Sequence, residues 1–151
     1  MRELVFALNY EPGTNTLADT LTDYPNAHVR SLSLHATTNS LWRVDHATGS
    51  LDALSAIEDA FLTTDYYTDC LAPESCGAES ETQVLDRADD MLVLYTYWQR
   101  TPVCISIPHL ALNYLGDGVL FETRHKQHRH TWRIFHSEGA DIHGFLDTLH
   151  T

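Results

Sequence analysis

The sequence predicts an α+β fold built from two copies of one β-α-β-β-α unit. Some segments alternate apolar and polar residues, as half-buried strands do. Other segments repeat apolar residues at three- and four-residue spacing, as amphipathic helices do. The same order of segments occurs twice, and a search for internal repeats finds a constant offset of 90 positions between the two series.

The first series is delimited by turn and capping residues. A Pro12-Gly13 turn ends the first strand, Asn15 or Thr16 caps the first helix, and Pro25 stops that helix. In the following hairpin, alternation predicts Leu32 and Leu34 on one face, opposite the neighbouring serines. The expected elements are a strand at 5–10, a helix at 16–24, hairpin strands at 29–36 and 41–46, a helix at 51–61 after Ser50, and a strand at 82–87.

The second series has the same order of elements. Its first strand is strongly apolar and aromatic, and its first helix opens at Ser106 and closes at Gly116. The final helix places apolar residues at i, i+3, i+4 and i+7. The expected elements are a strand at 91–98, a helix at 106–116, hairpin strands at 119–125 and 129–136, and a helix at 142–149.

The echo between the two series is clearest in their hairpins. At the offset of 90, the segment 42–46 (WRVDH) falls on 132–136 (WRIFH), and His35 falls on His125. We interpret this as a duplication into ferredoxin-like halves, each with an antiparallel sheet and helices on one face. The first half is 1–87, with an insertion at 65–80, and the second is 88–151. Together they form one compact unit with a groove between the halves, the default ligand site.

The charge of the chain is strongly acidic. The chain has 21 acidic residues against nine basic ones, a net charge of −12, and Lys126 is its single lysine. Self-repulsion on this scale is relieved when molar salt shortens the Debye length to about 3 Å, which indicates a halophile. No apolar run reaches the roughly 20 residues that span a bilayer, and the N-terminus lacks a signal pattern. We therefore expect a cytoplasmic protein without membrane contact.

Cysteines form the most reactive constellation of the sequence. Cys70 and Cys76 lie on the insertion. Cys104 lies in a strand-to-helix loop, and four residues separate it from His109. Cysteine thiolates and imidazole are the ligands that tetrahedral zinc prefers. The residues Cys70, Cys76, Cys104 and His109 are therefore our candidate zinc site. A reversible Cys70–Cys76 disulfide and three inert thiols are the alternatives that the sequence leaves open.

Five aromatic and imidazole side chains are candidates for binding a small ligand between the halves. They are His35, Trp42 and His46 of the first hairpin and Trp132 and His136 of the second. With nearby tyrosines, the three histidines would be the acid and base groups of a small enzyme of the dimeric α+β barrel type, although no pair of carboxylates or nucleophile motif accompanies them. Haem is disfavoured because the chain has no attachment motif.

The second hairpin also gathers positive charge. Arg124, Lys126, Arg129 and Arg133 lie within ten positions of one another. In so acidic a chain, this hairpin is the natural contact for an anion, an acidic partner or nucleic-acid phosphate. The hairpin has no recognition helix, so we expect no direct sequence-specific reading of DNA by this domain.

Several segments resemble the N-terminal domain of haloarchaeal regulators of the bacterio-opsin-activator type. These segments are Ser40–His46, the loop from Asp69 to Gly77, Tyr95–Trp98 and Pro108–Leu112. The resemblance implies a sensory domain that acts with a C-terminal helix-turn-helix. The sequence stops at Thr151 without such a motif, so DNA binding does not carry over to it.

Together these patterns predict an intracellular sensory or regulatory domain. The signal would be a metal, the redox state of the thiols or a small ligand, which shifts the packing of the two halves. The expected partners are a second copy of the chain, a protein partner, or a DNA-binding domain in the same or another chain. The small enzyme and a protein-interaction module that binds no ligand are the alternatives.

Overall fold

The protein has an α+β fold in which one antiparallel sheet carries four helices. The computed structural model describes residues 1–63, 79–99, 101 and 105–149. Within these residues, the sheet has seven strands. The elements are β1 (Arg2–Asn9), α1 (Thr16–Asp23), β2 (His28–Ala36), β3 (Ser40–Thr48), α2 (Leu51–Thr63), β4 (Glu79–Arg87), β5 (Met91–Gln99), α3 (Ile107–Leu115), β6 (Leu120–Lys126), β7 (Arg129–His136) and α4 (Ile142–Leu149).

The strand order of the sheet is β1-β7-β6-β2-β3-β5-β4, with every pair antiparallel. Both predicted hairpins, β2-β3 and β6-β7, are present, and the element order follows the sequence prediction. The order does not show two ferredoxin-like sheets, because β1 pairs with β7 and β5 pairs with β3. The first strand of each predicted half thus joins the hairpin of the other. Such long-range pairing leaves no local signal in the sequence.

The helix ends follow the expected capping chemistry. The Asn15 side chain accepts a hydrogen bond from the Ala18 N–H at 2.9 Å, which caps α1. Ser106 accepts in the same way from the His109 N–H at 3.2 Å and caps α3. Gly116 ends α3 with φ 89°, a conformation that glycine adopts without steric cost. The predicted boundaries of these two helices are therefore confirmed to within two residues.

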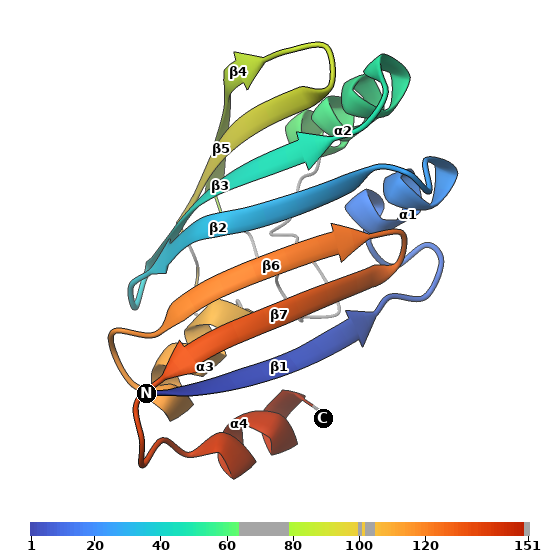
Figure 1. The fold of residues 1–151 in the computed structure, drawn as a ribbon. Helices are drawn as coiled ribbons and strands as arrows, with labels where there is room; N and C mark the ends of the chain where they lie inside the picture. Colours follow the sequence, from blue (N-terminus) through green and yellow to red (C-terminus); the bar gives the residue numbers. More distant parts are fainter. Residues whose placement is uncertain (64–78, 100, 102–104, 150–151) are drawn as a thin grey trace.

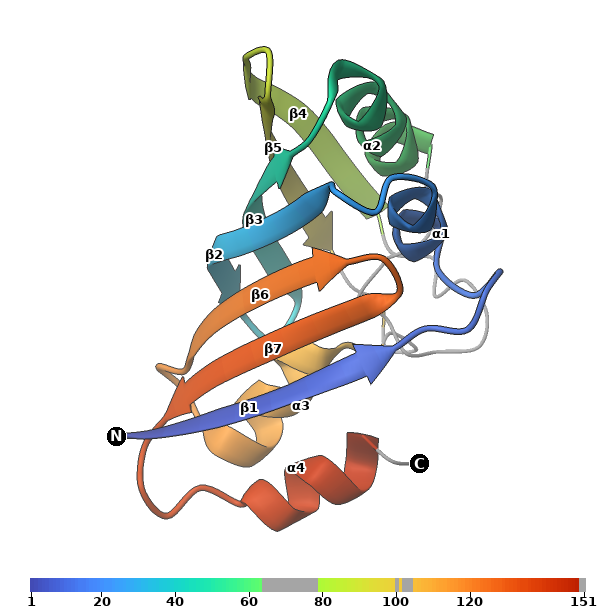
Figure 2. The same ribbon diagram turned by 45° about the vertical axis from the view of Figure 1, so that its right-hand side comes forward.

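All four helices lie on one face of the sheet, with α1 and α2 against one end of the strands and α3 and α4 against the other (Figures 1 and 2). We call this the covered face. No described helix or strand lies over the other face, which we call the open face. Two apolar clusters fill the covered face: α3 and α4 pack on Trp132 and Ile134, and α1 and α2 pack on Val29, Ala47 and Leu94.

A buried polar belt crosses the covered face between these two clusters. On β3, for example, the pair Arg43 and Asp45 separates Leu41 of one cluster from Ala47 of the other. The exposed fraction of each belt side chain is at most 6%. The belt consists of Ser31, Arg43, Asp45, Thr96, Thr123, His125 and His130.

A β-bulge in β2 changes the faces that alternation predicts. The register with β3 shifts between Ser31 and Ser33, so two residues of β2 occupy the space of one. Ser31 and Leu34 are buried as a result, whereas the exposed fraction of Leu32 is 49%. The expectation that Leu32 and Leu34 share a face is therefore wrong, because strict alternation fails at a bulge.

The sequence echo between the hairpins does not place its tryptophans alike. Trp132 is fully buried on the covered face, whereas Trp42 belongs to the open face beside Val44. A shift of one residue in a strand moves every side chain to the opposite face. Residues that match at the offset of 90 are therefore not equivalent in this part of the sheet.

No helix within the described ranges is both long enough and apolar enough to span a bilayer.

Candidate ligand-binding groove

A groove opens on the open face where the central strands β2 and β6 separate. The two strands pair only from Val29 to Ser31, opposite Thr123 to His125. Beyond the bulge they diverge, and the space between them forms a groove of about 400 Å³. Its lining comes from β2, β3, β5, β6 and β7: Leu32, Ser33, Leu34, His35, Trp42, Arg43, Val44, Tyr95, Leu120, Phe121, Glu122 and Phe135.

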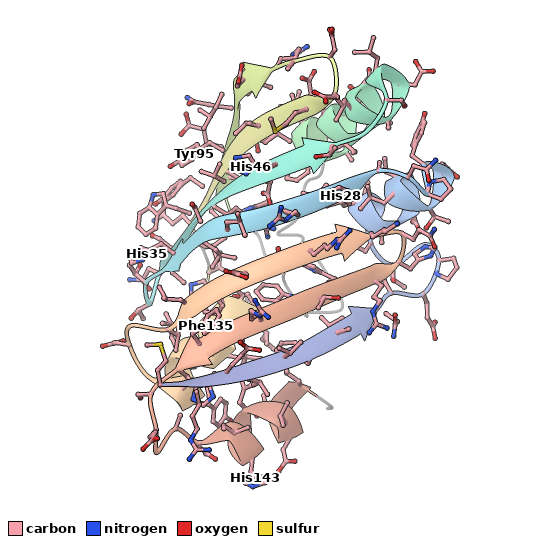
Figure 3. All side chains as sticks on the ribbon, in the orientation of Figure 1. His28, His35, His46, Tyr95, Phe135 and His143 are labelled. Atoms are coloured by element: carbon pink, nitrogen blue, oxygen red, sulfur yellow. The ribbon has the colours of Figure 1, made fainter. Side chains whose placement is uncertain are left out.

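Aromatic and aliphatic side chains dominate the groove wall. The Trp42 ring lies 5.7 Å from the His35 ring and 5.4 Å from the Tyr97 ring, measured between centroids. Figure 3 shows His35, Tyr95 and Phe135 on the side of the sheet away from the helices. Leu32 and Leu120 of the same wall are 49% and 59% exposed. The wall can therefore bury a small apolar or aromatic molecule.

A second hollow adjoins the groove and is basic. It has a volume of about 450 Å³, and Leu32 and Glu122 line both spaces. We call it the basic hollow; its lining is Val5, His28, Arg30, Leu32, Glu122, Thr123, Arg124, Thr131 and Arg133. Burial lowers the pKa of His28 below its usual 6.5, and the positive charges of Arg124, Arg30 and Lys126 lower it further. Three arginines, Arg30, Arg124 and Arg133, thus line this hollow against one carboxylate, Glu122.

One arginine of the basic hollow, Arg133, forms ion pairs with two glutamates. Arg133 lies 3.6 Å from Glu3 and 3.6 Å from Glu122, measured between nitrogen and oxygen. Its guanidinium carbon also lies 5.8 Å from the centroid of the Phe135 ring. Arg133 thus links the carboxylate at the border of the groove to an aromatic residue of its wall.

The five predicted ligand-binding residues do not meet in one place. His35 and Trp42 line the groove. His46 is the register partner of Arg30 and lines neither the groove nor the basic hollow. Trp132 and His136 are buried on the covered face, with 0% and 1% exposure. The structure thus brings two of the five together at the groove and separates two others from it by the thickness of the sheet.

The predicted zinc site falls largely outside the described residues. Cys70, Cys76 and Cys104 lie outside the described residues, whereas the fourth predicted ligand, His109, is described. Its Nε2 lies 3.1 Å from the Ser40 carbonyl oxygen, and its Nδ1 lies 2.5 Å from the Ser106 hydroxyl. Because a carbonyl oxygen only accepts, Nε2 carries a proton, and a metal would have to displace Ser106 from Nδ1. Within the described part of the chain, no three metal-binding side chains cluster.

The buried polar belt holds titratable groups on the covered face. Arg43 makes a bidentate ion pair with Asp45, at 2.9 Å through Nε and 2.8 Å through Nη2. The His130 ring stacks on the His125 ring with centroids 4.6 Å apart, and its buried Nε2 has no hydrogen-bond partner among the described residues. Burial, followed by the charge of Arg43, lowers the pKa of His130 to about 3. His130 is therefore a neutral structural group.

The sequence prediction missed several residues of the groove and its border. Tyr95 and Phe135 lie on alternate strand positions facing away from the helices, and Arg30 does so on β2. Alternation within β5 and β7 gave a usable signal, because Leu94 and Ile134 next to them are strongly apolar. The bulge that exposes Leu32 had no such signal.

Comparison with known proteins places the chain in a family. The N-terminal domain family HVO_2928_N, which has a haloarchaeal name, matches residues 3–151. No curated protein and no solved structure matches the chain. The match covers nearly every residue of the sheet and the helices. The chain therefore belongs to the HVO_2928_N family of N-terminal domains.

Proposed function

We propose that the protein is a sensory domain that binds a small, largely apolar ligand in the groove on its open face. The observation that carries this proposal is the fork between β2 and β6, where Trp42, Tyr95 and Phe135 surround about 400 Å³ of accessible space. Aromatic side chains on strands are held rigidly, so they lose little conformational entropy when a ligand binds. A carboxylate, Glu122, and an imidazole, His35, supply polar groups at its wall.

The position of the groove gives the ligand a means to act on the rest of the fold. The β2-β6 pair joins the strands β1-β7-β6 to the strands β2-β3-β5-β4, and it consists of three residue pairs. A ligand between the separated ends of these strands would bind some conformers, which differ in the angle between β2 and β6, more tightly than others. Such differential affinity shifts the population of conformers, which is how a sensory domain transmits a signal.

The proposed setting of this domain is a regulator. The family is described only as an N-terminal domain, which is compatible with this setting. We propose a halophile cytoplasm as its location and a regulator of the bacterio-opsin-activator type as its context. The excess of 21 acidic over nine basic residues supports the first part. Under this proposal, reading of DNA belongs to a different domain.

A zinc or thiol signal remains a separate prediction. The three cysteines would report metal or redox state, and His109 would be the fourth zinc ligand. Elemental analysis with thiol counting on the purified protein tests this prediction directly. Bound zinc at one equivalent would support it, whereas three freely titrating thiols without metal would exclude it.

The groove proposal is tested with a neutral apolar fluorophore, N-phenyl-1-naphthylamine. We expect saturable binding at one site and about a tenfold loss of affinity in Trp42→Ala, because the ring contributes roughly 1 kcal/mol or more beyond its area. Leu85→Ala is the matched control, since Leu85 is 54% exposed on β4 and lines neither hollow.

Equal affinities of Trp42→Ala and Leu85→Ala would contradict the proposal. So would binding that does not saturate. Circular dichroism of each variant confirms that a loss of binding is not a loss of fold.

A further inference from the structure

Two arginines face each other across the central strand pair of the sheet. Arg30 of β2 is the register partner of Arg124 of β6, and both side chains are exposed. Residues in direct register have Cβ atoms about 4.5 to 5.5 Å apart, so their side chains interact. Like charges in such positions destabilise a sheet. The centre of the open face thus carries an unfavourable contact.

No acidic side chain of the described residues makes an ion pair with Arg30 or Arg124. Glu122, the carboxylate that lines the basic hollow, pairs with Arg133 instead, as does Glu3 of β1. The chain does not lack acids, since it has 21 of them. A carboxylate from a neighbouring strand would have relieved the repulsion, yet Thr131 and His46 flank the pair in the same row.

Positive charge extends from this pair along three strands. Of the nine basic residues, five lie on β2, β6 and β7: Arg30, Arg124, Lys126, Arg129 and Arg133. Burial lowers the pKa of His28, and the charges of Arg124, Arg30 and Lys126 lower it further. In a protein with a net charge of −12, this concentration attracts anions to one place on the surface.

The pair adjoins the apolar groove directly. Leu32, two positions after Arg30, lines both the groove and the basic hollow, as does Glu122, two positions before Arg124. A molecule lying over Leu32 would therefore touch aromatic side chains at one end and guanidinium groups at the other. Guanidinium groups bind carboxylate and phosphate through paired, charge-assisted hydrogen bonds.

We propose that the ligand of the groove is an amphipathic anion, whose apolar part packs on Trp42 and Phe135 and whose acidic group lies between Arg30 and Arg124. This inference rests on the proposed function and adds the chemical class of the ligand. A carboxylate or phosphate in this position converts the repulsion between the arginines into two attractions.

A matched pair of probes tests the inference. We compare 2-naphthoate with the neutral 2-naphthalenemethanol by displacement of N-phenyl-1-naphthylamine from the full chain. The naphthalene rings are the same, so a difference in affinity reports the carboxylate. We expect the acid to bind about tenfold more tightly, because a hydrogen bond to a charged group is stronger than one between neutral groups.

Three variants locate the acidic group. Arg30→Gln and Arg124→Gln should each remove most of the preference for the acid while leaving the affinity of the alcohol unchanged. Arg2→Gln removes the same charge from an exposed position on β1 that lines neither hollow, and should change nothing. Molar KCl should reduce the preference in the unmodified protein, because it screens exposed charges.

The outcomes separate this inference from the proposed function. Equal affinity for acid and alcohol, with both weakened by Trp42→Ala, would overturn the anion and leave the groove proposal intact. Failure of both compounds and of the fluorophore to bind would overturn both proposals. A short oligothymidylate that binds more tightly than 2-naphthoate, and depends on Arg30, would overturn the small ligand in favour of single-stranded nucleic acid.

Discussion

The two faces of the sheet use the same strands for different purposes. On β7, Trp132 is buried against Phe6 and Phe121, while its neighbours Arg133 and Thr131 line the basic hollow. On β3, the buried Arg43 and Asp45 alternate with Trp42 and Val44 of the groove. Each strand therefore contributes to the core and to the candidate site at once. The covered face is packed for stability, and the open face keeps the aromatic side chains accessible.

The treatment of charge differs even more between the faces. The covered face buries one arginine, Arg43, and neutralises it with a bidentate carboxylate, Asp45. The open face exposes Arg30 and Arg124 in direct register without an ion pair from a described acidic residue. A buried charge without a partner would unfold the domain, whereas an exposed one is solvated. Under our proposal, the anionic group of a ligand supplies the counter-charge on the open face.

The largest expected effect comes from replacing each of the two tryptophans that match at the offset of 90, Trp42 and Trp132, with alanine. Trp132→Ala should lower the free energy of unfolding by about 3 to 5 kcal/mol, because it leaves a cavity in the core. Trp42→Ala should lower it by about 1 kcal/mol or less, because Trp42 lies at an accessible groove. Urea unfolding of both variants measures the difference. Similar losses would mean that the open face is part of the core.

A second pair of variants compares the buried and the exposed arginines. Asp45→Asn should destabilise the fold by about 3 to 5 kcal/mol, because it removes the negative charge of the buried carboxylate that pairs with Arg43 through Nε and Nη2. Arg30→Gln should leave stability unchanged or raise it by up to about 1 kcal/mol, because it removes a cross-strand repulsion. Thermal unfolding without added ligand measures both. A clear loss of stability in Arg30→Gln would show that Arg30 has a structural partner.

A third prediction, whose effect within one pH unit is small, concerns the buried His130. Its pKa falls from 6.5 to about 3 on folding, so between these values the unfolded chain binds a proton that the folded chain does not. Stability is therefore full above pH 6.5 and decreases as the pH falls, by about 1.4 kcal/mol for each unit. His130→Phe should make this slope shallower by about one proton, as urea unfolding at several pH values would measure.

His143→Gln is the control for this prediction, because His143 is exposed on α4. Its slope should equal that of the unmodified protein. An unchanged slope in His130→Phe would mean that His130 is not the group that resists protonation.

Local chemistry made most of the elements predictable. Asn15 and Ser106 cap helices, Gly116 ends one, and alternating residues mark both hairpins. The candidate site was predictable only in part. His35 and Trp42 line the groove, but Trp132 and His136 belong to the core, because a sequence match does not determine the face of a strand.

The sequence by itself determined the α+β class, the order of strands and helices along the chain and the excess of acid, since these depend on neighbouring residues and on composition. Only the tertiary structure decided that β1 joins β7, that β5 joins β3, and that β2 and β6 separate after three residue pairs. Those pairings depend on contacts between segments distant in the chain. The groove, and the arginine pair beside it, exist because of them.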